Sequence, residues 1–272
     1  MNWRTVLTVC GRDLRDAARN PGALVPAVVV PLVVTMALPL AIIYLPVLTR
    51  VPLTTFNWVA IFYAHIPPAV RAQLSALPAE AVEFYALAVY FFLPFFMLIP
   101  AAASTVAAAD SFAGEKERRT LEALFYTPAT DGELLFGKAL AALVPGLAAA
   151  WAGLAAYTAL IDVIGWSRYR LLPLPNVTWL LAGAVLLPAM AALAVALTVV
   201  VSARAKTSRG AQQVAGVVVV PAVALLVMQS LGVAYMGWGM VLLLSALAAA
   251  GAWLLLVLAT RTFRRENAVL YS

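Results

Sequence analysis

The sequence predicts an all-α membrane protein with six transmembrane helices and both termini in the cytoplasm. Three observations support this prediction: an unusually apolar composition, long stretches without a charged residue, and an uneven distribution of Lys and Arg. The chain is 64% hydrophobic and 11% charged, whereas soluble domains average about 45–50% and about 25%. A soluble fold of 272 residues cannot bury so much apolar surface, so a lipid bilayer is the expected solvent.

Five stretches of more than 20 residues contain no charged residue, and they cover residues 20–49, 84–109, 139–161, 171–203 and 210–260. About 20 apolar residues cross the hydrocarbon core as a helix, so each of the first four stretches predicts one span. The fifth would form a helix about 77 Å long at 1.5 Å per residue, and it must therefore turn back at the glycines between Ser230 and Gly239. Prolines inside these stretches are tolerated in membrane helices and predict kinks; among them are Pro26, Pro31, Pro39, Pro94, Pro145, Pro188 and Pro221.

The basic residues gather on one side of the predicted membrane. An even number of spans places both termini on the same side, together with residues 109–138 and 202–209. All of the 18 Lys and Arg lie there except Arg50, Arg71, Arg168 and Arg170. Because basic residues are retained on the cytoplasmic side, we expect a multi-pass protein of the cytoplasmic (inner) membrane. The net charge of +6 is then a topology signal and does not indicate nucleic-acid binding.

Two segments flank the first span. Residues 1–20 predict an amphipathic helix on the inner membrane surface, whose apolar positions are Trp3, Val6, Leu7, Cys10 and Leu14. Such a helix is either an anchor or a docking element. Residues 47–83 form the main extracytoplasmic segment, which prolines divide into short pieces and which carries the only histidine, His65. With no second histidine or cysteine nearby, we expect His65 to be a surface residue and predict no metal site.

None of the six predicted spans carries Asp, Glu, Lys, Arg or His in its interior. Such residues are costly in a bilayer and mark proton or ion paths, so their absence argues against a proton-coupled carrier, an intramembrane protease or a metalloenzyme. A sodium-coupled carrier that uses backbone carbonyls is only disfavoured. The second span is rich in aromatic residues, which either line a path for hydrophobic cargo or face lipid: Tyr90, Phe91, Phe92, Phe95 and Phe96.

The segment from Gly132 to Lys138 has the spacing of a phosphate-binding loop. The residue after Lys138 is Ala139, whereas that loop needs a Ser or Thr as the magnesium ligand, and it follows a strand. No buried strand precedes Gly132, and the segment continues into a predicted span. We therefore expect no nucleotide site, no cofactor and no catalytic residue in this chain.

Residues 109–138 predict a cytoplasmic helical hairpin between the second and third spans. Charges recur at helical spacing, with Glu115 placed to meet Arg119 and Arg118 placed to meet Glu122. Thr130-x-x-Glu133 predicts a capping box that opens the third span. The hairpin is either a solvated loop whose charges pair among themselves or a projecting element that docks a partner.

The run from Glu115 to Leu124, followed by Thr127-Pro128 and by the segment Glu133–Lys138, resembles the cytoplasmic signature of type-2 ABC transporter permeases. One departure is Arg119, where many relatives have glycine. The resemblance implies a single permease transmembrane domain over residues 1–272. It also implies that this domain is the membrane subunit of an ATP-driven exporter, which forms a translocation path as a homodimer. Separate ATPase subunits would bind ATP and Mg²⁺.

By the same resemblance, the hairpin couples the permease to the ATPase. The residues implied in this coupling are Glu115, Lys116, Glu117, Arg118, Arg119, Thr120, Leu121, Glu122, Leu124, Pro128, Gly137 and Lys138. The aromatic, apolar spans favour a hydrophobic or amphiphilic cargo. Two alternatives are a stand-alone secondary carrier or channel and a membrane scaffold without transport. A carrier would be active alone, whereas a permease would require the ATPase.

Overall fold

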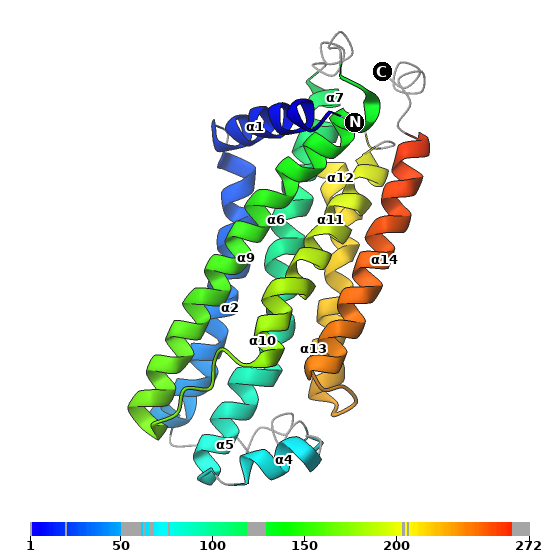
Figure 1. The fold of residues 1–272 in the computed structure, drawn as a ribbon. Coiled ribbons are helices and arrows are strands. Elements are labelled where there is room, and N and C mark those ends of the chain that lie inside the picture. Colours follow the sequence, from blue (N-terminus) through cyan, green and yellow to red (C-terminus); the bar gives the residue numbers. More distant parts are fainter. Residues whose placement is uncertain are drawn as a thin grey trace.

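The computed structural model describes residues 2–19, 21–49, 61, 64–65, 68–75, 77–118, 129–202, 205 and 207–262 (Figure 1). Within these residues every regular element is helical, and six segments are long and apolar enough to cross a membrane. The prediction of six spans is therefore confirmed. Figure 1 shows them as one bundle, with α1 (Trp3–Arg19) lying across one end and α4 (Pro68–Leu74) at the other.

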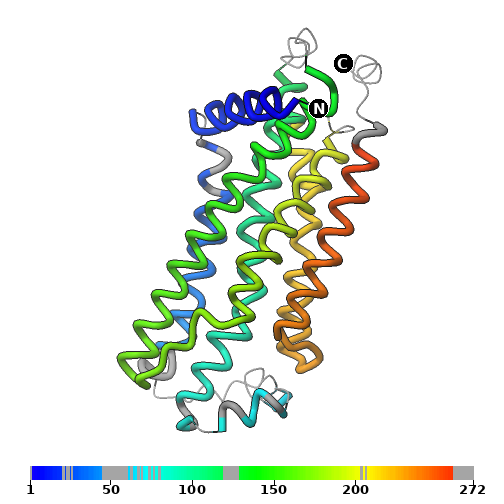
Figure 2. The backbone as a smooth tube through the Cα atoms, in the orientation of Figure 1, coloured from blue at the N-terminus to red at the C-terminus, as the bar shows by residue number. Residues whose placement is uncertain are grey.

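Five of the spans follow the charge-free stretches closely. In chain order they comprise α2 (Pro21–Thr49), α9 (Asp131–Tyr169), α10 with α11 (Val177–Leu181 and Leu187–Ser202), α12 with α13 (Ser208–Ala215 and Val220–Ser230) and α14 (Trp238–Thr262). The predicted turn between the last two is confirmed, because Gly232 adopts a φ of +71° after α13, a conformation that suits glycine. α14 runs toward the end of the bundle across which α1 lies (Figure 2).

The second span is the centre of the bundle. It runs through α5 (Ala79–Ala86), a π-helical turn (Leu87–Phe91), a 3-10 turn (Leu93–Met97), α6 (Leu98–Ala109), a second π-helical turn (Asp110–Gly114) and α7 (Glu115–Glu117). In the most apolar 18-residue stretch of this span, 83% of the residues are buried inside the bundle. The corresponding share is 17% for the first span and 22% for the last. Because α6 packs against α2, α9 and α11, a displacement of this span would disturb most of the fold.

The irregular turns of the second span leave backbone carbonyls that other helices satisfy. Pro94 has no N–H, so it cannot bond the carbonyls four or five residues earlier, and an unsatisfied carbonyl is costly in a bilayer. Three consecutive carbonyls here accept side-chain donors. The Ala88 carbonyl accepts from the Tyr157 hydroxyl at 2.9 Å and the Val89 carbonyl from the Trp179 indole N–H at 2.7 Å. The Tyr90 carbonyl accepts from the Gln229 amide at 3.0 Å. The third, fourth and fifth spans are thereby fastened to the second.

Candidate functional site

Four elements meet at the end of the bundle across which α1 lies: α1, the π-helical turn 110–114 with α7, the start of α9 and the start of α12 (Figure 1). The start of α9 is fixed by the predicted capping box, which is confirmed. The Glu133 N–H donates to the Thr130 hydroxyl at 3.3 Å, and the Thr130 N–H donates to the Glu133 carboxylate at 3.0 Å. Glu133 also accepts the backbone N–H of Asn2, so the same carboxylate holds the beginning of α1.

Lys138 is the centre of a group of charged side chains that is buried except for Arg12. The Lys138 side chain is 5% exposed, and its Nζ lies 2.8 Å from the Glu115 carboxylate and 3.2 Å from Asp13 Oδ2. Nζ also donates to the Ser111 carbonyl at 3.0 Å, and the Ser111 hydroxyl donates to Asp13 Oδ2 at 2.7 Å. The Arg12 guanidinium reaches Glu115 at 3.2 Å. We call these five residues, Arg12, Asp13, Ser111, Glu115 and Lys138, the Lys138 cluster.

The Lys138 cluster is electrically balanced. Two cations, Arg12 and Lys138, face two carboxylates. The side chain of Asp13 is 8% exposed and that of Glu115 is 11% exposed. Buried ions are tolerated when they are paired and hydrogen-bonded, but one left without its partner is strongly destabilising. The cluster therefore fixes α1, the end of the second span and the start of α9 in one arrangement.

Gly137 brings α9 close to α1. A Cβ at this position would lie 2.7 Å from Val9 Cβ and 2.9 Å from the Val6 carbonyl oxygen, which is closer than real contacts allow. Val6 and Cys10 are buried at this contact, at 1% and 6% exposure. Burial, and secondarily the Asp13 carboxylate, raise the pKa of the Cys10 thiol, so Cys10 is a protonated packing residue.

We expect Gly137→Ala to weaken the α1–α9 contact by about 1–3 kcal/mol, as is usual for an extra methyl in a filled space. Thermal unfolding of the purified protein measures this loss. Gly132→Ala is the matched control, because it lies on the same helix and nothing comes within 4 Å of a Cβ there. Gly137→Ala also gains helix propensity of about 1 kcal/mol, whereas Gly132→Ala gains less because it lies in the first turn of α9. Equal stabilities would contradict the tight contact.

Exposed charges next to the Lys138 cluster reach the start of the fifth span. The Glu117 carboxylate accepts the backbone N–H of Ser208 at 3.0 Å, at the beginning of α12. Arg118 pairs with Asp110, one residue before Ser111. The short α7 is therefore tied to α12 as well as to α1 and α9.

Comparison with known families identifies the chain. A family model described as "ABC-2 family transporter protein" matches residues 7–246. The chain belongs to the ABC-2 transporter family. It is accordingly a multi-pass membrane permease of an ABC transporter, as the resemblance of the hairpin predicted. A search of the curated proteins found no match.

The ABC-2 permease brings together only some of the residues that the sequence implied in coupling. Glu115, Lys138 and Gly137 lie in or beside the Lys138 cluster, and Lys116, Glu117 and Arg118 follow on the same helical end. The remaining implied residues lie outside the described residues; they are Arg119, Thr120, Leu121, Glu122, Leu124 and Pro128. The predicted pairs Glu115–Arg119 and Arg118–Glu122 therefore cannot be compared with the described contacts.

Glu115 is 8% exposed and turned toward Arg12 and Lys138, whereas a solvated loop would leave its carboxylate in water. The sequence patterns did not predict that Arg12, Asp13, Ser111 and Ser208 belong to this site. For Asp13 a signal existed, since Val6, Cys10 and Asp13 recur at a spacing of four and three residues and therefore share one helix face. An acidic residue in line with two apolar positions indicates a buried partner.

The segment 132–138 of the permease lies within α9. A helix does not form the glycine-rich loop that cradles phosphates, so the resemblance of this segment to a nucleotide loop is coincidental. Among the described residues no three His, Cys, Asp or Glu side chains are grouped to hold a metal ion. His65 is exposed, and its ring packs on Gly232.

The aromatic residues of the second span lie mainly in the interior of the permease. Tyr90, Phe91, Phe92 and Phe96 are at most 8% exposed, so they do not face lipid, and Phe95 is half-buried. The Phe96 ring packs edge-on against Tyr157 and Trp179, with centroids 5.0 and 5.1 Å away. These rings fill the core of a single chain.

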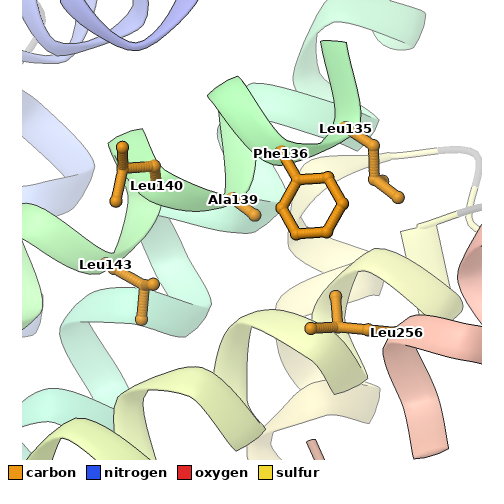
Figure 3. Close-up of a pocket in the computed structure, with 6 residues that line it drawn as sticks. All are labelled: Leu135, Phe136, Ala139, Leu140, Leu143 and Leu256. Carbon is orange, nitrogen blue, oxygen red and sulfur yellow. The ribbon is translucent and has the colours of Figure 1, made fainter. Parts of the chain in front are cut away.

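A small apolar pocket lies between α9 and α14, near the Lys138 cluster along α9. It has a volume of about 130 Å³ and is lined by Leu135, Phe136, Ala139, Leu140, Leu143 and Leu256 (Figure 3). No lining side chain carries a polar group that could bind a charged ligand or take part in catalysis.

Proposed function

We propose that this permease is the membrane subunit of an ATP-driven exporter. In this proposal two copies of the chain form the translocation path, and separate ATPase subunits, which bind ATP and Mg²⁺, dock on the segment 110–138. The end of the bundle that carries α1 would face the cytoplasm, because the basic residues concentrate there. The observation that supports docking at this place is the convergence of four elements on Glu115 and Glu117.

The contacts of α7 explain how a push from the ATPase would reach the spans. α7 continues through the π-helical turn 110–114 into α6, so its displacement would move the most buried span along its own axis. Glu115 would carry the same displacement to α1 and α9 through Arg12 and Lys138, and Glu117 would carry it to α12. The exposed side chains Glu117 and Arg118 would make the polar contacts with the ATPase, together with Lys116.

The remaining hairpin residues keep the roles that the resemblance implies. Arg119, Thr120 and Glu122 would add polar contacts, Leu121 and Leu124 would supply an apolar contact, and Pro128 would form a rigid corner before α9. The cargo path would run between the two copies and carry a hydrophobic or amphiphilic molecule. Of the five aromatic candidates only the half-buried Phe95 offers surface in this conformation, and the other four would reach a path only if the spans separated.

Exchange of two exposed charges at the end of α7, Glu117 and the following Arg118, tests the docking proposal. We expect the double variant Glu117→Arg with Arg118→Glu to recover about tenfold less ATPase on co-purification, equal to about 1.4 kcal/mol. Net charge and the buried Glu115 are unchanged, so membrane insertion should persist. Arg71→Glu, an exposed charge reversal at the opposite end, is the control.

Three outcomes would contradict the proposal. Normal ATPase recovery and normal ATP-driven transport in the double variant would exclude docking at α7. Transport by the purified permease alone would indicate a carrier. A complex that never shows transport-linked ATP hydrolysis would indicate a scaffold.

A further inference from the structure

We infer that α1 is a binding site for anionic lipid headgroups, and that lipid bound there acts on the coupling segment through the Lys138 cluster. The helix has three faces. One is buried against α9 and carries Val6, Cys10 and Asp13. The second is apolar and exposed, and the third carries exposed arginines. The regulatory part of this inference rests on the proposed ATPase coupling, whereas the lipid site does not.

The second face places apolar side chains where acyl chains begin. Trp3 and Leu7 lie one turn apart and are 63% and 59% exposed. α1 ends at Arg19, and α2 begins at Pro21 and continues as the first span. The helix is therefore tethered at the level where the chain enters the bilayer, and Figure 1 shows it running crosswise to the spans. Tryptophan is enriched at this membrane–water boundary.

The third face fits phosphate groups at the same level. Arg4, Arg15 and Arg19 are exposed, and at 100° per residue they lie about 60–120° around the helix from Leu7. Within the part of the chain that the structure describes, none of these three guanidinium groups has a carboxylate within ion-pair distance, whereas Arg12 pairs with Asp16 and Glu115. Three unpaired cations beside an apolar stripe match the charge of an anionic lipid and the amphipathic order of its headgroup and chains.

The first face connects this lipid site with the segment that we propose to dock the ATPase. Asp13 lies between the arginines in sequence but points to Lys138, which also holds Glu115. A headgroup that keeps α1 seated on the bilayer would therefore favour the arrangement in which the Lys138 cluster is closed. Lipid composition would in this way set how firmly α7 is connected to the spans.

The lipid site is tested with the permease alone. The probe is a phosphatidylcholine vesicle with increasing phosphatidylglycerol, and the readout is the phosphatidylglycerol retained by the protein after mild detergent extraction. We expect the variant R4Q/R15Q/R19Q to bind phosphatidylglycerol about a hundredfold more weakly, which corresponds to about 1 kcal/mol per arginine. The control R71Q/R168Q/R170Q removes three exposed arginines at the opposite end and should retain the lipid. Equal retention by both variants, or equal loss, would overturn the site.

The regulatory step is tested with the permease–ATPase complex in the same vesicles. The rate of ATP hydrolysis should depend on phosphatidylglycerol content for the parent chain and the control, and not for R4Q/R15Q/R19Q. A complex of that variant that still responds to phosphatidylglycerol would overturn the regulatory step. If the permease does not change the rate of ATP hydrolysis in any of the lipid mixtures, the proposed coupling fails. The amount of phosphatidylglycerol retained by the permease alone still decides the lipid site.

Discussion

Replacing Lys138 with methionine is expected to lower the free energy of unfolding by about 3–5 kcal/mol, the usual cost of removing one partner from a buried ion pair. The substitution keeps an unbranched side chain of similar shape, one heavy atom shorter, but leaves Asp13 and Glu115 facing each other without the cation between them. Arg12 reaches only Glu115 among these carboxylates, so Asp13 would lose its cation. Thermal unfolding of the purified protein gives the measurement.

Lys116→Met is the control for this prediction, because Lys116 is only half-buried and lies one residue from Glu115. It should change stability by less than about 0.5 kcal/mol. The double variant K138M/D13N should recover part of the loss, since it removes the carboxylate that loses its cation, and a mutant cycle measures this coupling. A Lys138→Met protein as stable as the Lys116→Met protein would mean that the cluster is solvated.

The spans could be predicted from the sequence because the signal for them is local. A charge-free stretch of sufficient length indicates a span wherever it occurs, and the turn at Gly232 and the capping box at Thr130 depend on a few adjacent residues. These features were confirmed without any knowledge of packing. The reason is that none of them depends on contact with a neighbouring helix.

The Lys138 cluster could not be predicted in the same way. Lys138 and Asp13 are 125 positions apart in the chain, and nothing local to either residue names the other. The position of the second span inside the bundle could not be predicted either. An entirely apolar helix has the same sequence character whether it faces lipid or other helices. In the structure Phe92 and Phe96 are completely buried. Most of the aromatic residues that were candidates for a cargo path are therefore not accessible in this conformation.

Tyr157→Phe and Trp179→Phe should each destabilise the permease, because each removes the donor for a carbonyl of the irregular turn in the second span. Hydrogen bonds between membrane helices average about 0.6 kcal/mol, with a maximum near 1.7 kcal/mol. We expect Trp179→Phe to lie at the upper end, since Pro94, five residues after Val89, cannot supply a backbone donor as a substitute. Trp179→Phe should cost more than Tyr157→Phe, because it also removes part of the ring that stacks on Tyr157 at a centroid distance of 5.0 Å.

The double variant should lower the free energy of unfolding by about 3 kcal/mol. A loss greater than the sum of the two single variants would indicate that the two hydrogen bonds hold one turn jointly. Trp253→Phe is the matched control, since Trp253 is 68% exposed and belongs to the outer surface of α14. If Tyr157→Phe proved as stable as the parent protein, the π-helical turn would relax to satisfy its own carbonyls. The second span would then be held by apolar packing alone, and a push on α7 would meet less resistance from the third and fourth spans.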